Sequence, residues 1–176
     1  MFINNHLIGG KFITWNTIYN YMSIEEKIKE LGFELPNPST PIASYVSVMK
    51  VGNILYLSGH GPEFKEGKPV VTGKVGKDLT EEEGYKVAQG VALNLIATIK
   101  SEIGDLNRVS RIIKLLGFVN SAPGYTRQPW VINGASDLLV KIFGEVKGKH
   151  ARSALSANEL PMNIPVEIEM IAEIQE

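Results

Sequence analysis

The chain contains no cysteine among its 176 residues. A disulfide scaffold, a thiol nucleophile and a thiolate metal site are therefore excluded. An excess of one charge is also lacking, since 18 Lys and Arg stand against 19 Asp and Glu, for a formal net charge of −1. Because binding to nucleic acid depends on a basic excess, this balance argues against RNA or DNA as the main partner.

Long apolar runs are missing as well. No stretch approaches the roughly 20 apolar residues that span a bilayer, so no membrane partner is expected. The first 21 residues lack the basic start and apolar block of a signal peptide, and their single Lys disfavours a transit peptide. Together with the absent cysteine, these features predict a cytoplasmic protein. The three histidines, at positions 6, 60 and 150, lack metal-ligand spacing, so no metal is expected.

The composition that remains, 44% hydrophobic and 21% charged, is that of one globular domain with a core. Residues 1–21 are rich in Asn, Ile and Thr and show no steady period. Ser23 and Glu26 then form a capping box that opens a short helix, which Gly32 ends. We therefore predict a single domain over residues 22–176 and a dispensable extension over residues 1–21. Disorder and an artefact of the start site both remain open as explanations of that extension.

The predicted order of elements in the domain is strand, strand, helix, strand, helix, strand, strand, and this order indicates an α+β fold. Gly52-Asn53 joins the first two strands as a hairpin, and a small second hairpin is expected through Val70 and Val71. Interior Gly134 predicts a close backbone approach in the second helix. The expected elements are strands at 45–51, 54–58, 111–120, 151–157 and 166–170, and helices from 80 to about 102 and from 128 to 144.

Arg152 is the first candidate site residue. A strand alternates its faces, so Arg152, Ala154 and Ser156 share one side, and the small neighbours leave room above the guanidinium. Such a hollow suits a carboxylate held by two hydrogen bonds. A rim arginine in a surface ion pair is the commoner origin of this pattern. Glu167 and Glu169 alternate with apolar residues, which is also typical of the solvated face of a strand.

The segment "HARSALSANELPMNIPVEIEMIAEI" resembles the C-terminal signature of the Rid/YjgF family, which comprises an A-R-S run, a Leu-Pro pair and an E-I-E strand. Two upstream segments, "ASYVSVMKVGNILYLSGH" and "NRVSRIIKLLGFVNSAPGY", are similar to the family's first hairpin and to the strand after its long helix. The likeness runs from Pro41 to Ile174 in the family's order.

This resemblance implies a chorismate-mutase-like (YjgF-like) α+β fold, in which a mostly antiparallel sheet is backed by two helices. It further implies a homotrimeric barrel with a site at each subunit interface. The nearly all-apolar strand after the long helix is then explained, because one of its faces meets helices and the other meets neighbouring subunits.

The resemblance also assigns roles. Arg152 corresponds to the arginine that grips the substrate carboxylate, and Glu167 to the acidic residue that positions a water. Tyr45, Ser58 and Gly59 correspond to hairpin residues that line the pocket from the adjacent subunit.

On the second helix, Asn133 corresponds to a family asparagine in the same pocket. Two positions depart from the family: Ala154 stands where cysteine is frequent, and His60 stands where glutamine is frequent. Both departures are expected to reshape the pocket and its substrate preference.

The implied reaction is the hydrolysis of reactive 2-imino or 2-enamino acids to 2-keto acids and ammonia, without a cofactor. Two alternatives stay open: a protein that binds small carboxylates such as keto acids without turnover, and an endoribonuclease. The balanced charge and the missing aromatic platform argue against RNA cleavage.

Overall fold

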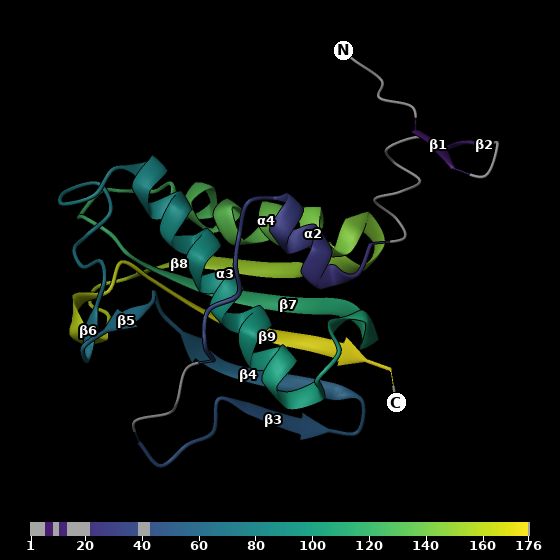
Figure 1. The fold of residues 1–176 in the computed structure, drawn as a ribbon. Helices are drawn as coiled ribbons and strands as arrows, with labels where there is room; N and C mark the ends of the chain where they lie inside the picture. The colour runs from purple at the N-terminus through teal and green to yellow at the C-terminus, as the bar shows by residue number, and fades with distance from the viewer. Residues whose placement is uncertain (1–5, 9–10, 14–21, 39–42, 176) are drawn as a thin grey trace. The chain divides into compact units, whose positions relative to one another are not determined.

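The computed structural model describes residues 6–8, 11–13, 22–38 and 43–175 (Figure 1). The chain divides into two compact units, Met1–Glu34 and Leu35–Glu176. Within the described ranges, no helix has the length and apolar character needed to cross a membrane.

The first unit holds two short strands and a short helix. Strand β1 (His6–Ile8) pairs antiparallel with β2 (Lys11–Ile13). Helix α2 (Ile24–Glu30) begins at the predicted capping box: the Ser23 hydroxyl accepts from the backbone N–H of Glu26 at 3.2 Å, and the Glu26 carboxylate accepts from that of Ser23 at 2.7 Å. The rest of the predicted extension lies outside the described residues, and the proposed boundary at residue 22 stays a prediction.

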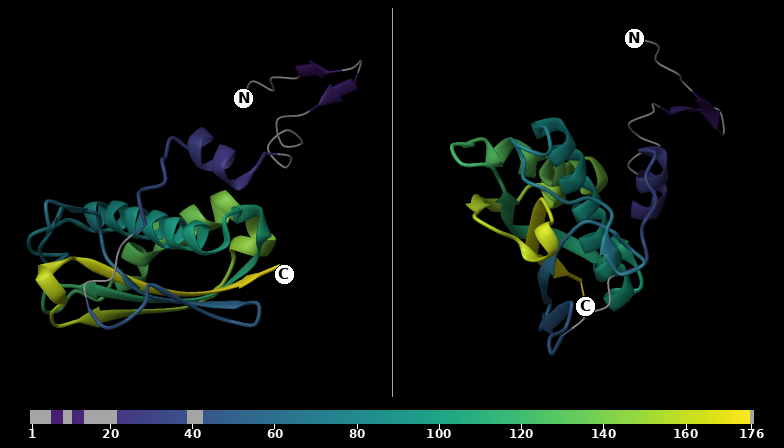
Figure 2. Two further views of the ribbon diagram at one scale, coloured as in Figure 1. Left: turned by 60° about the horizontal axis from the view of Figure 1, so that its bottom comes forward. Right: turned by 90° about the vertical axis from the view of Figure 1, so that its left-hand side faces the viewer.

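The second unit is a five-stranded sheet in the order β3-β4-β9-β7-β8, and two helices lie on one of its faces (Figure 2). All neighbouring strands are antiparallel except β7 and β8, which are parallel. This arrangement confirms the predicted α+β class, the mostly antiparallel sheet and the order of elements. The strands of the sheet are β3 (Val48–Val51), β4 (Ile54–His60), β7 (Val109–Asn120), β8 (Ala151–Ala157) and β9 (Val166–Ile174), and the helices are α3 (Glu81–Ile103) and α4 (Gln128–Gly148).

The positions of the two hairpins in the second unit are set by the residues of their turns. Gly52, at φ 59°, and Asn53 join β3 and β4 as predicted. The small hairpin lies earlier than predicted, between β5 (Phe64–Lys65) and β6 (Lys68–Pro69), because Glu66 and Gly67 adopt the positive φ angles of a two-residue turn. Val70 and Val71 lie beyond it. The first strand was predicted from Tyr45 but begins three residues later at Val48, so Tyr45 precedes it, as the family resemblance implies.

The two helices pack closely at Gly134. A Cβ at this position would lie 2.9 Å from the carbonyl carbon of Tyr85 in α3, and closer still to the carbonyl oxygen. The predicted close backbone approach is thereby confirmed. The helix was predicted to end at Gly144. This residue does interrupt α4, with φ 80° and ψ 169°, but a further helical segment continues to Gly148.

Alternation along the strands separates the two faces of the sheet. Toward α3 and α4 lie fully buried side chains, among them Leu55, Ile112, Leu115, Val166 and Ile168. The opposite face carries large apolar residues that are about half exposed or more: Met49, Val51, Tyr56 and Leu155. Among the described residues of the second unit, no helix lies over this second face, which we call the open face (Figure 2).

The contact at Gly134 gives a stability prediction with a matched control. Gly134→Ala is expected to lower the free energy of unfolding by about 1–3 kcal/mol, because the added methyl group meets backbone that cannot move away without separating the helices. Gly90→Ala, in the interior of α3, is expected to raise it by about 1 kcal/mol, since nothing lies within 4 Å of the new atom. Urea unfolding of both variants measures the difference; equal effects would contradict the close packing.

Candidate functional site

Arg152 lies on β8 and points toward α4. Its Nη1 donates to Asn133 Oδ1 at 2.9 Å and to Ser136 Oγ at 3.0 Å. Asn133 and Ser136 are three residues apart in α4 and so share one side of the helix. The structure thus brings two predicted site residues, Arg152 and Asn133, into direct contact.

The remaining donors of Arg152 are free to bind a ligand. Both donors of Nη1 are used, whereas Nε and Nη2 make no hydrogen bond to any residue in the described ranges. Within those ranges no carboxylate lies at ion-pair distance from the guanidinium either. Burial lowers the pKa of Arg152, and Asp137, which accepts a hydrogen bond from Tyr85, partly opposes this effect. The Nε–Nη2 edge is the planar pair of donors that matches a carboxylate.

Ala154 lies on the same face of β8 as Arg152, as the alternation predicted. It pairs with Gly117 of β7, where a Cβ would lie 2.7 Å from the terminal methyl of Ile132 in α4. The small residues of this region therefore have a packing role as well: they let α4 lie close enough to reach the guanidinium.

Glu167 lies on β9 and points to the open face. It pairs with Phe118, and its side chain crosses Gly59 so closely that a Cβ there would lie 2.9 Å from the carboxyl carbon. Burial raises the pKa of Glu167, and the neighbouring carboxylate of Glu169 raises it further. No described residue donates a hydrogen bond to this carboxylate, so its oxygens remain available to a water or a ligand.

Ser58 directly precedes Gly59 in β4. The Ser58 hydroxyl donates to the carbonyl of Val46 at 2.7 Å, and the Ser58 N–H donates to the carbonyl of Ser47 at 3.0 Å. These two bonds hold the segment that carries Tyr45, whose side chain is 50% exposed. Gly59 and its neighbour Ser58 thus lie with Glu167, and Tyr45 lies in the segment that Ser58 holds.

Six of the seven predicted residues therefore form two groups, which we call half-sites. The arginine half-site comprises Arg152, Asn133 and Ala154, and the glutamate half-site comprises Glu167, Gly59 and Ser58. Arg152 pairs with Leu115 of β7 and Glu167 with Phe118, three residues further along, so the two side chains point to opposite faces of the sheet. One chain alone cannot bring both half-sites to the same ligand.

His60 is buried beneath the glutamate half-site rather than within it. A carbonyl can only accept, so Nδ1 donates to the carbonyl of Ser58 at 2.7 Å, and Nε2 then accepts from the Thr98 hydroxyl at 2.8 Å. A register shift in β4 between Leu57 and His60 turns the ring toward α3. We expected His60 to reshape the pocket; in this structure it acts on the half-site only through the backbone at Ser58.

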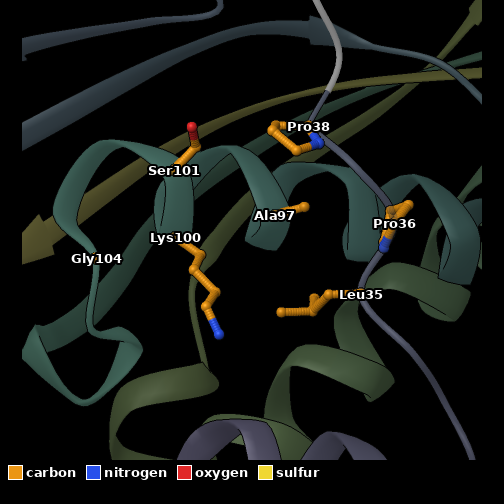
Figure 3. A pocket seen from close by; sticks show the side chains of 7 residues that line it. All are labelled: Leu35, Pro36, Pro38, Ala97, Lys100, Ser101 and Gly104. Atoms are coloured by element: carbon orange, nitrogen blue, oxygen red, sulfur yellow. The ribbon is translucent and has the colours of Figure 1, made fainter.

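The two hollows found on the second unit lie elsewhere. One, of about 350 Å³, lies along the C-terminal part of α3, and Figure 3 shows its lining residues: Leu35, Pro36, Pro38, Ala97, Lys100, Ser101 and Gly104. The other, of about 280 Å³, is on the open face and is lined by Tyr56, Leu57, Lys114, Leu116, Glu169, Met170 and Ile171. Neither of these hollows includes Arg152 or Glu167. Among the described residues, no cluster of three His, Asp or Glu could hold a metal ion.

Sequence analysis missed Ser136 and His150. His150 Nε2 lies 3.0 Å from Ser136 Oγ, which in turn contacts Arg152. Two signals were available: Ser136 follows Asn133 at the spacing of one helix face, and His150 precedes Arg152 by two residues at the start of an extended strand.

Comparison with known proteins identifies the family. A family model described as "YjgF/chorismate_mutase-like, putative endoribonuclease" matches residues 25–174. The chain therefore belongs to the YjgF/chorismate-mutase-like family, in agreement with the resemblance seen in its motifs. The match also begins earlier than that resemblance and includes the helix α2.

Several individual proteins are similar over most of the chain. Protein TCP17 of Trypanosoma cruzi is 39% identical over 86% of this chain and 94% of its own. The crystal structure of Atu1372, a protein of unknown function from Agrobacterium tumefaciens, has a TM-score of 0.80 and 44% identity, covering 91% of this chain and 99% of that one. The crystal structure of a putative endoribonuclease from Shewanella oneidensis has a TM-score of 0.82 and 33% identity, covering 87% of this chain and 100% of that one.

The buried His60 gives a prediction for stability against pH. Burial lowers its pKa in the folded state, against the opposing effect of the Ser58 carbonyl. Below the ordinary histidine pKa the unfolded chain takes up a proton that the folded chain does not, so the His60 contribution is complete above that pKa and is lost as the pH falls. The stability advantage over His60→Gln should therefore shrink between pH 7.5 and 5.0, by at most about 1.4 kcal/mol per pH unit.

Urea unfolding at several pH values measures this difference. Comparison with the variant removes the contributions of the other titrating groups, including His150, because both proteins retain them. A stability difference that stays constant over this pH range would contradict a neutral, buried His60.

Proposed function

We propose that this protein hydrolyses small 2-imino acids, or their enamine tautomers, to 2-keto acids and ammonia. The reaction takes place at sites that two copies of the chain complete within a homotrimer. The observation that carries the proposal is the state of Arg152: a partly buried guanidinium, fixed through Nη1, with its Nε–Nη2 edge unpaired among the described residues. The two donors of this edge match the two oxygens of a planar anion, such as the carboxylate of the substrate.

Glu167 supplies the second function. A carboxylate whose pKa is raised by burial can accept a proton from water at near-neutral pH. The water oxygen bonds to the carbon of the protonated C=N group, and a water proton passes to Glu167. Glu167 then passes this proton to the nitrogen of the carbinolamine. The C–N bond breaks as the hydroxyl oxygen gives its proton back to Glu167, and the keto acid and ammonia leave. Imines already hydrolyse in water, so positioning and proton transfer suffice, and no cofactor is invoked.

Two features of the second unit support the proposed homotrimer. The open face exposes large apolar side chains, including Met49, Tyr56 and Leu155, as expected of a surface that other copies cover. The half-sites point to opposite faces, so Arg152 of one copy can meet Glu167 only of another. Packing three sheets into a barrel, as the family resemblance implies, would satisfy both requirements.

Two alternatives have distinct signatures. A protein that only binds keto acids would hold pyruvate but release no ammonia from a freshly generated imine. The Shewanella relative is described as a putative endoribonuclease. The net charge of −1 gives RNA phosphates little to bind. RNA digestion that is present in the purified protein and lost in Arg152→Ala would favour the nuclease.

The carboxylate grip is tested at Arg152. Arg152→Lys is expected to fail nearly as badly as Arg152→Ala, since an ammonium group lacks the two parallel donors. The loss of kcat/KM corresponds to about 2–5 kcal/mol of transition-state binding. Ammonia release from freshly generated imines measures it, with thermal unfolding as the folding control. Activity retained in Arg152→Lys would contradict the two-point grip.

The shared site is tested with mixed oligomers. Arg152→Ala and Glu167→Gln are each expected to abolish turnover, whereas Glu167→Gln keeps keto-acid binding, because the arginine remains. When the two variants are co-expressed, about a quarter of the interfaces in randomly assembled rings carry both intact residues, and activity should return in proportion. Failure of all mixtures to recover activity, with both variants folded and trimeric, would place the two residues outside a shared site.

A further inference from the structure

A relay of hydrogen bonds leads from the turn after α4 to Arg152. His150 lies in this turn, with Nδ1 2.7 Å from the carbonyl oxygen of Gly148 and Nε2 3.0 Å from Ser136 Oγ. Ser136 Oγ lies 3.0 Å from Nη1 of Arg152. Three side chains from a turn, a helix and a strand are thus linked in sequence.

The chemistry of the end groups fixes the direction of the relay. The Gly148 carbonyl can only accept, so Nδ1 of His150 carries the proton, and Nε2 of the neutral ring is an acceptor. The guanidinium at the other end can only donate. The Ser136 hydroxyl must therefore donate to His150 and accept from Arg152. With a neutral imidazole, no other assignment of donors and acceptors uses all three bonds.

The start of the relay is held rigidly. A Cβ at Gly148 would lie 2.6 Å from the carbonyl oxygen of Leu139 and 2.7 Å from Cα of Val140. The backbone at Gly148, the last residue of α4, therefore packs directly on an earlier turn of the same helix. Burial and the charge of Arg152 lower the pKa of His150, and the Gly148 carbonyl only partly opposes them. The lowered pKa favours the neutral ring that the relay requires.

We propose that Ser136 and His150 are positioning residues, which hold Arg152 with its Nε–Nη2 edge toward the carboxylate of a bound imino or keto acid. This assignment rests on the proposed function. Asn133 alone fixes one of the two N–H bonds of Nη1, and a single hydrogen bond lets the guanidinium swing about that contact. The Ser136 bond fixes the second N–H and, with it, the plane of the fork.

The decisive measurement is the affinity for pyruvate, a 2-keto acid, determined by calorimetry or NMR titration on the full chain. Ser136→Ala is expected to raise Kd about tenfold, the usual effect of losing a hydrogen bond to a charged group. Ser136→Thr keeps the hydroxyl and should restore the affinity. His150→Ala should weaken binding as well, and it should add little to Ser136→Ala, because both act through one relay.

The background of Arg152→Ala separates positioning from a general structural role. In that background Ser136→Ala should have no further effect on pyruvate binding. In turnover, Ser136→Ala should raise KM and leave kcat within about twofold, because the carboxylate is held equally in the substrate and the transition state. Arginine NMR offers a readout without ligand: rotation of the Arg152 guanidinium should be faster in Ser136→Ala and in His150→Ala than in the unchanged chain.

The outcomes separate the two proposals. If the unchanged chain binds pyruvate and Ser136→Ala binds it equally well, with the same guanidinium rotation, the relay has no positioning role and the proposed function stands. A loss of affinity in Ser136→Ala that persists in the Arg152→Ala background also overturns the inference. If the unchanged chain neither binds pyruvate nor releases ammonia, the proposed function fails and this assignment fails with it.

Discussion

The arginine half-site depends on one constraint: a partly buried guanidinium must be held in place without using all of its donors. A carboxylate from the chain itself would hold Arg152 more strongly, but it would fill the edge that a ligand needs. Neutral acceptors, Asn133 and Ser136, fix Nη1 and leave Nε and Nη2 open. Those acceptors reach the guanidinium because α4 lies close to the sheet, where Gly117 allows Ile132 to approach.

The two-residue period of a strand imposes the second constraint. Once β7 lies between β8 and β9, the pairing of Leu115 with Arg152 and of Phe118 with Glu167 puts the two functional side chains on opposite faces. No rotamer change can bring them together, because the whole sheet separates them. Assembly is therefore part of the proposed chemistry: a site made from both half-sites exists only where two copies meet, and the apolar open face provides a reason for them to meet.

Local features were predictable from sequence because their causes are local. The capping box at Ser23, the turn at Gly52 and the close approach at Gly134 each follow from a few adjacent residues and were found as predicted. The grouping of site residues was not, because it depends on the parallel register of β7 and β8, which a whole intervening helix separates in the chain. His150 was missed for the same reason: its partner Ser136 lies across a helix-to-strand turn whose geometry no short motif describes.

Contacts that hold the fold and contacts that hold the ligand are separate in this domain. The helices are fastened to each other at Gly134 and to the sheet at Ile132, through apolar packing and backbone approach. Arg152 and Glu167 take no part in that packing, and neither is paired with an opposite charge among the described residues. Their side chains can therefore be matched to a ligand without disturbing the core. The same separation explains why family membership defines the fold more sharply than the substrate: apolar packing sets the sheet and helices, while the substrate depends on the few side chains around Arg152 and Glu167.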